Sequence, residues 1–292
     1  MLLTQKIEEI ACKYTDASGT IGKFLLKEKS KIENYSMQEI ADYTFSSRPT
    51  LVRFAKKLGY SGWRDFLKAF LKEVKYLEPN ILEVDFNVPF KKSDTTSSII
   101  KKISKVKIDA NLDTIELLDE GQLNDAVRIL KNSNRIVMLG ISINIIMAQL
   151  FQHKMLRIGR SVELINQVDQ AFMSYSLTKG DCVIVISYSA NNIERLPISL
   201  LKSLKEHEVS IIGITSMGDN FIRAYSDATL TISSRENMYS KISSYATEES
   251  ILLILDILYS SYFSLEYDKN MEYKLQMSSS IEIHRNSSLG SI

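Results

Sequence analysis

The chain has 292 residues, of which 45% are hydrophobic and 24% charged, and its formal net charge at pH 7 is +1. This composition excludes a disordered or fibrous protein, and the length exceeds what one hydrophobic core usually serves, so we expect two domains. The longest apolar runs, residues 136–151 and 251–263, are interrupted by polar side chains, which argues against a membrane span.

The cysteines and the N-terminus indicate the compartment. Cys12 and Cys182 lie far apart and form no metal-spaced pair, which predicts two unpaired thiols in a reducing environment. Glu8 and Glu9 make the N-terminus acidic too early for a signal peptide. We therefore expect a cytoplasmic protein with no membrane partner. The chain has no G-x-G-x-x-G loop, P-loop or zinc spacing, so neither a cofactor nor a metal is expected.

Charge is unevenly distributed along the chain. Residues 1–110 hold 20 Lys and Arg against 14 Asp and Glu, whereas residues 111–292 hold 16 against 21. A basic first part fused to a mildly acidic second part is expected when only the first part meets a phosphate backbone. A solvated lysine-rich helix gives the same count, so charge alone does not decide.

The first part is predicted to be helical. Leu3, Ile7 and Ile10 recur at helical spacing, which predicts one amphipathic helix. Ile21, Phe24 and Leu25 predict a second, with Asp16 or Ser18 as its cap. Ser36-Met37-Gln38-Glu39 is a capping box, in which the Ser and Glu side chains satisfy free amides at a helix start. That short helix is expected to end near residue 43. After a turn of about four residues, the next helix starts at Ser47, with Pro49 in its first turn.

This second helix carries cations and no acid between residues 45 and 61. In a helix-turn-helix the second helix enters the major groove of DNA, where its first residues reach base edges and flanking cations hold phosphates. Arg48 and Thr50 are therefore predicted to read bases and Lys56 and Lys57 to hold phosphates, while Arg53 either reaches DNA or braces the fold. The candidate DNA contacts are Ser47, Arg48, Thr50, Arg53, Lys56 and Lys57. The alternative is a five-helix bundle with a solvated basic face.

The string T-L-V-R-F-A-K-K-L-G-Y-S-G-W-R-D-F, residues 50–66, resembles the end of the N-terminal domain of RpiR-type transcription regulators. That domain typically ends in a T-V-x-R-F-x-x-K-L-G-[FY]-x-G-[FW]-x-x-[FL] pattern, and the resemblance covers residues 1–77. Gly59 is placed to close the recognition helix, and Trp63 and Phe66 to pack back on the bundle. Phe45-Ser46 departs from the family, which usually has a small residue and a valine there.

Residues 78–119 are predicted to connect the two domains. Pro79 and Pro89 flank a stretch, residues 80–94, that lacks helical period and is interpreted as a linker. Helical spacing resumes at about residue 95, and a further helix is expected from residue 122. Such connecting helices either pair subunits or pack on the next domain.

The second part alternates strands and helices. Five short runs rich in β-branched residues are predicted strands: residues 135–139, 161–165, 182–186, 210–214 and 228–232. This pattern indicates a parallel sheet covered by helices on both faces. The predicted fold is therefore an all-α helix-turn-helix bundle followed by an α/β domain with a five-stranded parallel sheet. The remainder, residues 268–292, is interpreted as a tail of frayed helix and loop.

Ligands of such sheets bind beyond the carboxyl ends of the strands. Three of those ends are followed by turns rich in hydroxyls and amides, two of which are expected to open helices whose free amides favour an anion. A phosphate is the obvious candidate. The candidate ligand contacts are Ser142, Asn144, Ser187, Ser189, Asn192 and Thr215.

The turn after the third strand, S-Y-S-A-N-N-I-E, resembles the S-x-S-G-x-T-x-E motif of sugar isomerase (SIS) domains, whose hydroxyls and turn amides hold a phosphosugar. The resemblance implies a sugar-phosphate-sensing domain over residues 120–267. Ala190 replaces the expected Gly and Asn192 the expected Thr, while Ser142 and Asn144 stand where a Gly and a Ser are common. The alternative is a polar turn whose serines cap a helix and whose ancestral ligand has changed or been lost.

Three functions follow as hypotheses. The first is a DNA-binding transcription regulator of carbohydrate metabolism, a homodimer or homotetramer whose binding to double-stranded DNA is modulated by a sugar phosphate. The second is a SIS-fold phosphosugar isomerase with an accessory helical domain, and the third a SIS binding module with no DNA role. His153, His207 and His284 are interpreted as structural or surface residues, so no catalytic residue is assigned and an enzyme is not expected.

Overall fold

The computed structural model describes residues 2–77 and 84–282 of the chain. The chain folds into two compact units. The first comprises Met1–Asp113 with two short later segments, Ser216–Asp219 and Ser233–Thr247. The second comprises Thr114–Thr215, Asn220–Ile232 and Glu248–Ile292.

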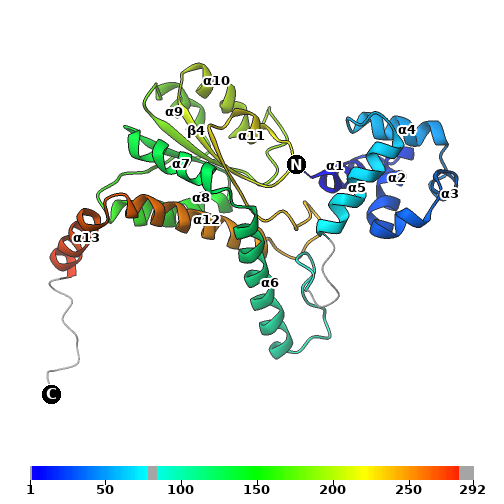
Figure 1. The fold of residues 1–292 in the computed structure, drawn as a ribbon, viewed down its shortest axis with the longest axis horizontal. Helices are drawn as coiled ribbons and strands as arrows, with labels where there is room; N and C mark the ends of the chain where they lie inside the picture. The colour runs from blue at the N-terminus through cyan, green and yellow to red at the C-terminus, as the bar shows by residue number, and fades with distance from the viewer. Residues whose placement is uncertain (1, 78–83, 283–292) are drawn as a thin grey trace. The chain divides into compact units, whose positions relative to one another are not determined.

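The first unit begins with a helical bundle, drawn in blue to cyan in Figure 1. Its helices are α1 (Leu3–Lys13), α2 (Ala17–Glu28), the 3₁₀ helix η1 (Lys29–Asn34), α3 (Met37–Tyr43), α4 (Arg48–Lys57) and α5 (Trp63–Leu77). Fully buried side chains from several of them, including Ile7, Leu25, Ile40, Leu51 and Phe66, form one core. The predicted helix-turn-helix is therefore α3, a turn of four residues, and α4.

The connecting region also matches the expected helix starts. Residues 84–95 contain no helix, α6 runs over Thr96–Leu117, and α7 over Glu120–Asn132. Within the first unit, Val106 and Ala110 of α6 pack on Phe86 of the linker and on Ala246. The linker residues Pro79 and Asn80 lie outside the described residues.

The second unit holds the predicted sheet, whose five strands are all parallel. They are β1 (Ile136–Leu139), β2 (Glu163–Leu164), β3 (Cys182–Ile186), β4 (Ser210–Thr215) and β5 (Ala228–Thr231). The order across the sheet is β2-β1-β3-β4-β5, and the register pairs Leu139 with Val185 and Ile186 with Ile214. The carboxyl ends of β1, β3 and β4 therefore lie side by side at one edge.

Helices cover both faces of this sheet (Figure 1). Met138 and Ile184 belong to a core shared with α7, α8 (Ile143–Leu156) and α12 (Tyr245–Ser264), whereas Val137 and Val183 belong to a second core. That second core is completed by α9 (Gln170–Ser176), η2 (Ile198–Leu200), α10 (Leu201–Glu206) and α11 (Phe221–Tyr225). Burial on both faces explains why the strands read as continuous apolar runs. A further helix, α13 (Tyr267–Glu282), occupies most of the predicted tail.

In the described residues, no helix combines the length and hydropathy needed to cross a bilayer.

Candidate functional site

The turn between α3 and α4 fixes the start of the predicted recognition helix. Ser47 is the N-cap of α4, and its hydroxyl lies 2.9 Å from the Thr50 hydroxyl. Arg53 donates from Nη2 to that same Thr50 oxygen at 3.1 Å. Arg48 is exposed beside them as the first residue of the helix. The structure thus brings Ser47, Thr50 and Arg53 into one chain of hydrogen bonds at the exposed N-terminal end of α4.

The other end of α4 is closed by Gly59, whose φ is +92°. The Tyr60 amide donates to the Ala55 carbonyl at 3.1 Å and the Gly59 amide to the Lys56 carbonyl at 3.0 Å, the bond pattern of a Schellman motif. Lys56 and Lys57 are both exposed in this last turn.

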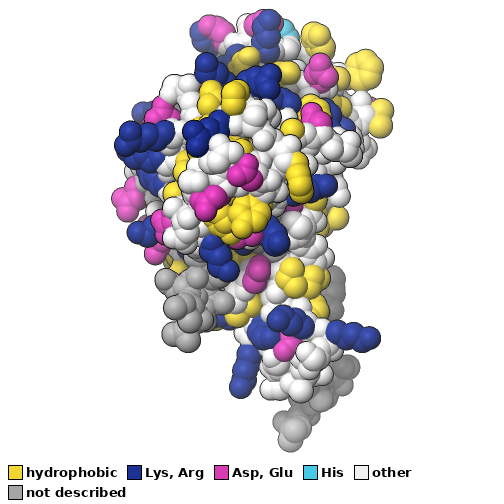
Figure 2. Space-filling view, turned by 90° about the vertical axis from the view of Figure 1, so that its right-hand side faces the viewer, with side chains coloured by type: hydrophobic (Ala, Val, Ile, Leu, Met, Phe, Trp, Pro, Cys, Tyr) yellow, Lys and Arg dark blue, Asp and Glu magenta, His cyan; other side chains and the backbone are white. Residues whose placement is uncertain are grey.

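Lys57 also has a contact inside the bundle. Its ammonium lies 4.2 Å from the centre of the Tyr14 ring, a cation–π distance. Lys57 thus has a partner in the fold, which makes Lys56 the cleaner test of a phosphate contact. On the face drawn in Figure 2, Lys and Arg side chains lie among acidic and hydrophobic ones.

The capping box before α3 has formed as predicted. The Glu39 amide donates to the Ser36 hydroxyl at 3.2 Å, and the Ser36 amide donates to the Glu39 carboxylate at 2.7 Å. Hydrogen bonding of the Glu39 carboxylate by the Ser36 amide, and secondly by the Ser36 side chain, holds the pKa of the Glu39 carboxyl below its usual range, because it favours the ionised form. The box sets where α3 begins and hence where the turn to α4 falls.

In the second unit, the turn after β1 begins one candidate site. Asn144 donates from Nδ2 to the Ile186 carbonyl at 3.2 Å and so joins this turn to the end of β3. Ser142 is the exposed N-cap residue of α8, with φ at +55° and no side-chain capping bond. Its hydroxyl is thus not used in capping the helix.

The turn after β3 lies directly beside it. Ser187 accepts the Ala190 amide on its hydroxyl at 3.3 Å, and the Ser189 hydroxyl donates to the Asn191 side chain at 3.1 Å. Asn192 accepts the Glu194 amide at 2.9 Å on its side-chain oxygen and is otherwise exposed.

Two of the three turns are followed by helices, as expected, since α8 follows β1 and α11 follows β4. The turn after β3 is not, because residues 187–197, all of them described, form turns and bends, and the next helical turn is η2 at Ile198. Ala190 has φ at +43°, a left-handed conformation that turns the chain away from helical geometry. Any anion held after β3 would therefore meet hydroxyls and irregular backbone amides rather than a helix N-terminus.

Thr215, at the end of β4, is fully buried. Its hydroxyl donates to the Tyr188 carbonyl at 3.2 Å and accepts from Nδ2 of the Asn220 side chain at 3.1 Å. Thr215 therefore holds the turn after β3 in place through its bond to the Tyr188 carbonyl.

Gln170, which sequence reasoning did not single out, belongs to the same edge. It is fully buried at the start of α9, and its Nε2 donates to the Gly140 carbonyl at 2.8 Å. Among the described residues its Oε1 has no hydrogen-bond partner. A buried, unpaired amide oxygen is costly, so Gln170 is an additional candidate ligand group. A lone Gln in a helix carries no sequence signal for this role.

The remaining chemistry is sparse. His153 lies within α8, and His207 is the C-cap of α10 with its ring 6.0 Å from that of Tyr175; His284 lies outside the described residues. The described residues contain no cluster of His, Cys, Asp or Glu suited to a metal ion.

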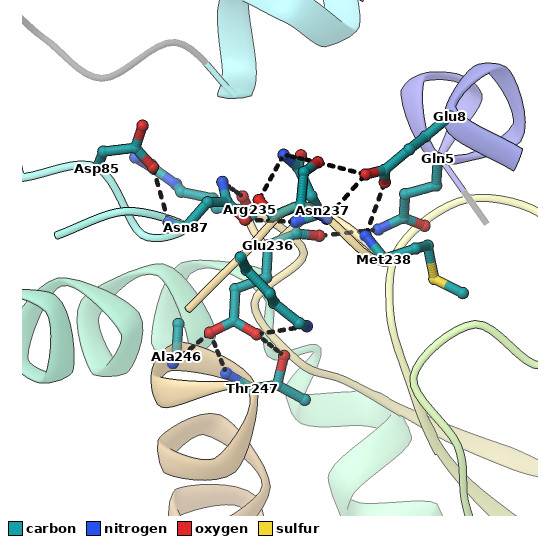
Figure 3. Close-up of polar contacts among 12 residues, drawn as sticks. Gln5, Glu8, Asp85, Asn87, Arg235, Glu236, Asn237, Met238, Ala246 and Thr247 are labelled. Atoms are coloured by element: carbon teal, nitrogen blue, oxygen red, sulfur yellow. Dashed lines mark hydrogen bonds and ion pairs between the residues drawn. The ribbon is translucent and has the colours of Figure 1, made fainter. Parts of the chain in front are cut away.

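The segment Ser233–Thr247, which follows β5, is bound to α1 within the first unit (Figure 3). The carboxylate of Glu8 accepts the Met238 amide at 2.8 Å, the Ser240 amide at 3.1 Å and the Ser240 hydroxyl. Glu8 is only 6% exposed. Three hydrogen bonds to one buried carboxylate therefore attach this segment to the helical bundle at a defined position.

A second carboxylate, Glu236, holds the segment to the start of α12. It is 2% exposed and accepts the Ala246 amide at 2.6 Å, the Thr247 hydroxyl at 2.7 Å and the Lys241 ammonium at 3.1 Å. The helix start is thereby capped from within the segment.

Arg235 ties the same segment to α5 and α6. It forms an ion pair with Asp113 at 3.1 Å, and its guanidinium lies 5.3 Å from the centre of the Tyr76 ring. Tyr76 donates to Asp113 at 2.9 Å, and burial together with this carboxylate raises the pKa of Tyr76 far above its usual range. Asn87 of the linker accepts the Asn237 amide at 2.6 Å.

Comparisons with known proteins agree with this arrangement. Residues 1–75 match the helix-turn-helix domain of the rpiR family, and residues 129–259 match the SIS domain. An uncharacterized HTH-type transcriptional regulator of Clostridium perfringens is 24% identical over 281 residues, which is 96% of this chain and 99% of the relative.

Two solved structures share the fold. The NanR protein of Vibrio vulnificus, complexed with ManNAc-6P, superposes with a TM-score of 0.61 at 17% identity, covering 98% of this chain and all of that one. The sugar isomerase domain of an RpiR transcription factor from Sphaerobacter thermophilus has a TM-score of 0.53 at 12% identity, covering 62% of this chain and 98% of that one.

Proposed function

Because the chain is a transcription regulator of the RpiR type, with a helix-turn-helix domain followed by a SIS domain, we propose that it binds operator DNA through α4 under the control of a sugar phosphate. The sugar phosphate binds at the carboxyl edge of the sheet. The genes it regulates serve carbohydrate metabolism.

The exposed polar end of α4 supports the DNA contact. Arg48 and Thr50 read bases there, with Ser47 and Arg53 holding the Thr50 hydroxyl in place, while Lys56 contacts phosphate. This is the observation that carries the proposal, because a helix start, a run without acids over residues 45–61 and exposed cations coincide on one helix.

The turns after β1 and β3 support a small anionic ligand. Ser142, Ser187 and Ser189 offer hydroxyls at the edge where Asn144 joins the two turns. Neither turn contains Lys or Arg within residues 140–144 or 187–192, so recognition uses neutral donors that select shape as well as charge. The structural neighbour NanR, complexed with ManNAc-6P, suggests the class of ligand to try.

A homo-oligomer follows from the symmetry of operator recognition. Two recognition helices read half-sites about 34 Å apart, one DNA turn, when a two-fold axis relates them. On α8, Ile143, Ile146 and Leu150 are exposed at spacings of three and four and so share one helix face. An apolar face of this kind supports pairing with a second copy as a homodimer, or with more copies as a homotetramer.

The segment Ser233–Thr247 is the proposed route between ligand and DNA. By chain connection it leaves β5 at the carboxyl edge of the sheet, and by its bonds to Glu8 it is fixed to α1 of the bundle. A cavity of about 150 Å³, lined by Glu8, Phe70 and Ser240 among others, lies beside these bonds. We infer that the segment has a second arrangement, and that a ligand shifts the balance by binding one arrangement better than the other.

The DNA contact is tested with the full-length protein on duplexes from its own upstream region, followed by fluorescence anisotropy. Arg48→Ala is expected to weaken the preferred duplex about tenfold to hundredfold and to relax its selectivity. Lys56→Ala is expected to weaken all duplexes alike and to lower the slope of log Kd against log salt by about one.

Lys179→Ala removes an exposed cation of the second unit and is the control; it is expected to bind as the wild type does. Wild-type affinity and selectivity in both α4 variants would exclude α4 as the recognition helix.

A further inference from the structure

Phe45 stands out in the helix-turn-helix because nothing in its own bundle accounts for it. The side chain is 94% exposed, the highest value among the large apolar side chains of the described residues. Tyr43, two residues earlier, is also exposed, but its ring stacks on Phe24 at 5.6 Å. Tyr43 therefore has a packing role, whereas Phe45 presents its ring to solvent.

The backbone at Phe45 is unfavourable as well. Its φ is +49°, in the left-handed region that Gly and Asn adopt readily and bulky residues avoid. Two hydrogen bonds fix this conformation, since the Ser46 amide donates to the Ala41 carbonyl at 2.8 Å and the Phe45 amide to the Asp42 carbonyl at 3.2 Å. Gly or Asn would suit the turn better, so stability does not explain the phenylalanine. A bulky apolar residue at a position that disfavours it in both backbone conformation and solvation points to a function.

Its surroundings indicate the partner. Phe45 lies two residues before Ser47, the N-cap of α4, at the end of the helix where Arg48 is exposed and Thr50 half-buried. No acidic residue occurs from Phe45 to Ser61. An apolar ring close in sequence to hydroxyls and an arginine suits a partner with both negative charge and apolar groups. DNA is such a partner, because it combines phosphates with the methyl groups of thymine in the major groove.

We propose that Phe45 contacts the methyl group of a thymine at the edge of each half-site and so helps to determine which operator is bound. The proposal rests on DNA binding by α4. It adds an apolar contact from the turn to the polar contacts from the helix.

The test removes the ring and the methyl group separately. Full-length wild type and Phe45→Asn are titrated against the best-bound upstream duplex and against copies in which single thymines are replaced by uracil, which lacks only the methyl. Asn is chosen because it tolerates the left-handed turn, so the thermal midpoint is expected to equal or exceed that of the wild type.

For the wild type, uracil at one position per half-site is expected to weaken binding about five- to tenfold. Phe45→Asn is expected to show a loss of the same size on the unmodified duplex and no further loss with uracil there. Both proteins should bind a random duplex equally. Phe172→Asn, which removes an exposed phenylalanine of the second unit, is the matched control and should behave as wild type.

Two results overturn the inference while leaving DNA binding intact. One is wild-type operator affinity in Phe45→Asn, and the other is an equal loss of affinity for operator and random duplexes. A wild type that binds no duplex contradicts the proposed function itself, and with it this contact.

Discussion

Three residues of the proposed binding surfaces have left-handed backbone although none is glycine. Phe45, Ser142 and Ala190 have φ values of +49°, +55° and +43°. Such a conformation costs a residue with a Cβ about 1 kcal/mol. Strain of this kind is tolerated where the surrounding structure imposes it, and here it coincides with the turn before α4 and the two turns after β1 and β3.

The two thiols are expected to differ in reactivity. Cys182 is fully buried in β3, and burial raises the pKa of its thiol to about 12, whereas Cys12 is exposed. At pH 8 only about one Cys182 in ten thousand is then a thiolate, the reactive form.

Iodoacetamide at pH 8 should therefore alkylate Cys12 alone in the folded protein and both residues in guanidinium, as read by mass spectrometry of the peptides. Cys12→Ser gives the control with no reactive thiol. Prompt alkylation of Cys182 in the folded control would show that β3 opens readily.

Capping residues were easier to predict from the sequence than contacts between segments far apart in the chain. The Ser36 box, the Ser47 cap and the Gly59 stop were all predicted, because capping depends on residues within one turn of the chain. The cation–π contact of Lys57 with Tyr14 and the burial of Thr215 under Tyr188 depend on distant segments, so no local pattern indicates them.

At the scale of elements, the segment Ser233–Thr247 is the feature that links otherwise separate parts of the chain. It contributes one buried carboxylate, Glu236, and receives another, Glu8, from α1. The segment is rich in Ser and has the composition of an ordinary loop, so the sequence did not indicate its role.

Glu8→Gln is expected to loosen this segment. Glutamine keeps only one of the two acceptor oxygens, and its NH2 group then faces either the Met238 amide or the Ser240 amide, both of which are donors. The loss is expected to be about 1–3 kcal/mol in local stability. Hydrogen exchange should then speed up at residues 238 and 240 about fivefold to hundredfold.

Glu33→Gln, an exposed carboxylate of the same unit, is the control and should leave this exchange unchanged. Equal protection of residues 238 and 240 in wild type and Glu8→Gln would mean that Glu8 does not hold the segment.

Prediction of elements succeeded where burial is simple. The β3 strand was predicted to the residue and the other strands to within two residues at each end, because a parallel sheet buried on both faces leaves continuous apolar runs. After β3, the left-handed turn at Ala190 redirects the chain before η2 begins.

At the scale of the whole molecule, the proposed DNA-binding and ligand-binding surfaces belong to parts of the chain with opposite net charge. The first 110 residues have an excess of cations and the remainder an excess of acids, so we expect nonspecific attraction to DNA to come mainly from the part that carries α4. The neutral hydroxyl-rich turns after β1 and β3 belong to the acidic part. A ligand there controls DNA binding only if its binding free energy differs between two arrangements of the chain.

The most direct test of this account is the operator affinity of the full-length protein at fixed salt, with and without each member of a sugar-phosphate panel that includes ManNAc-6P. We expect at least one sugar phosphate to change the Kd for the operator fivefold or more. We expect the double variant Ser187→Ala, Ser189→Ala to bind the same operator with unchanged affinity and to lose that response. Operator binding that no sugar phosphate alters, or a response that survives in the double variant, would contradict the account.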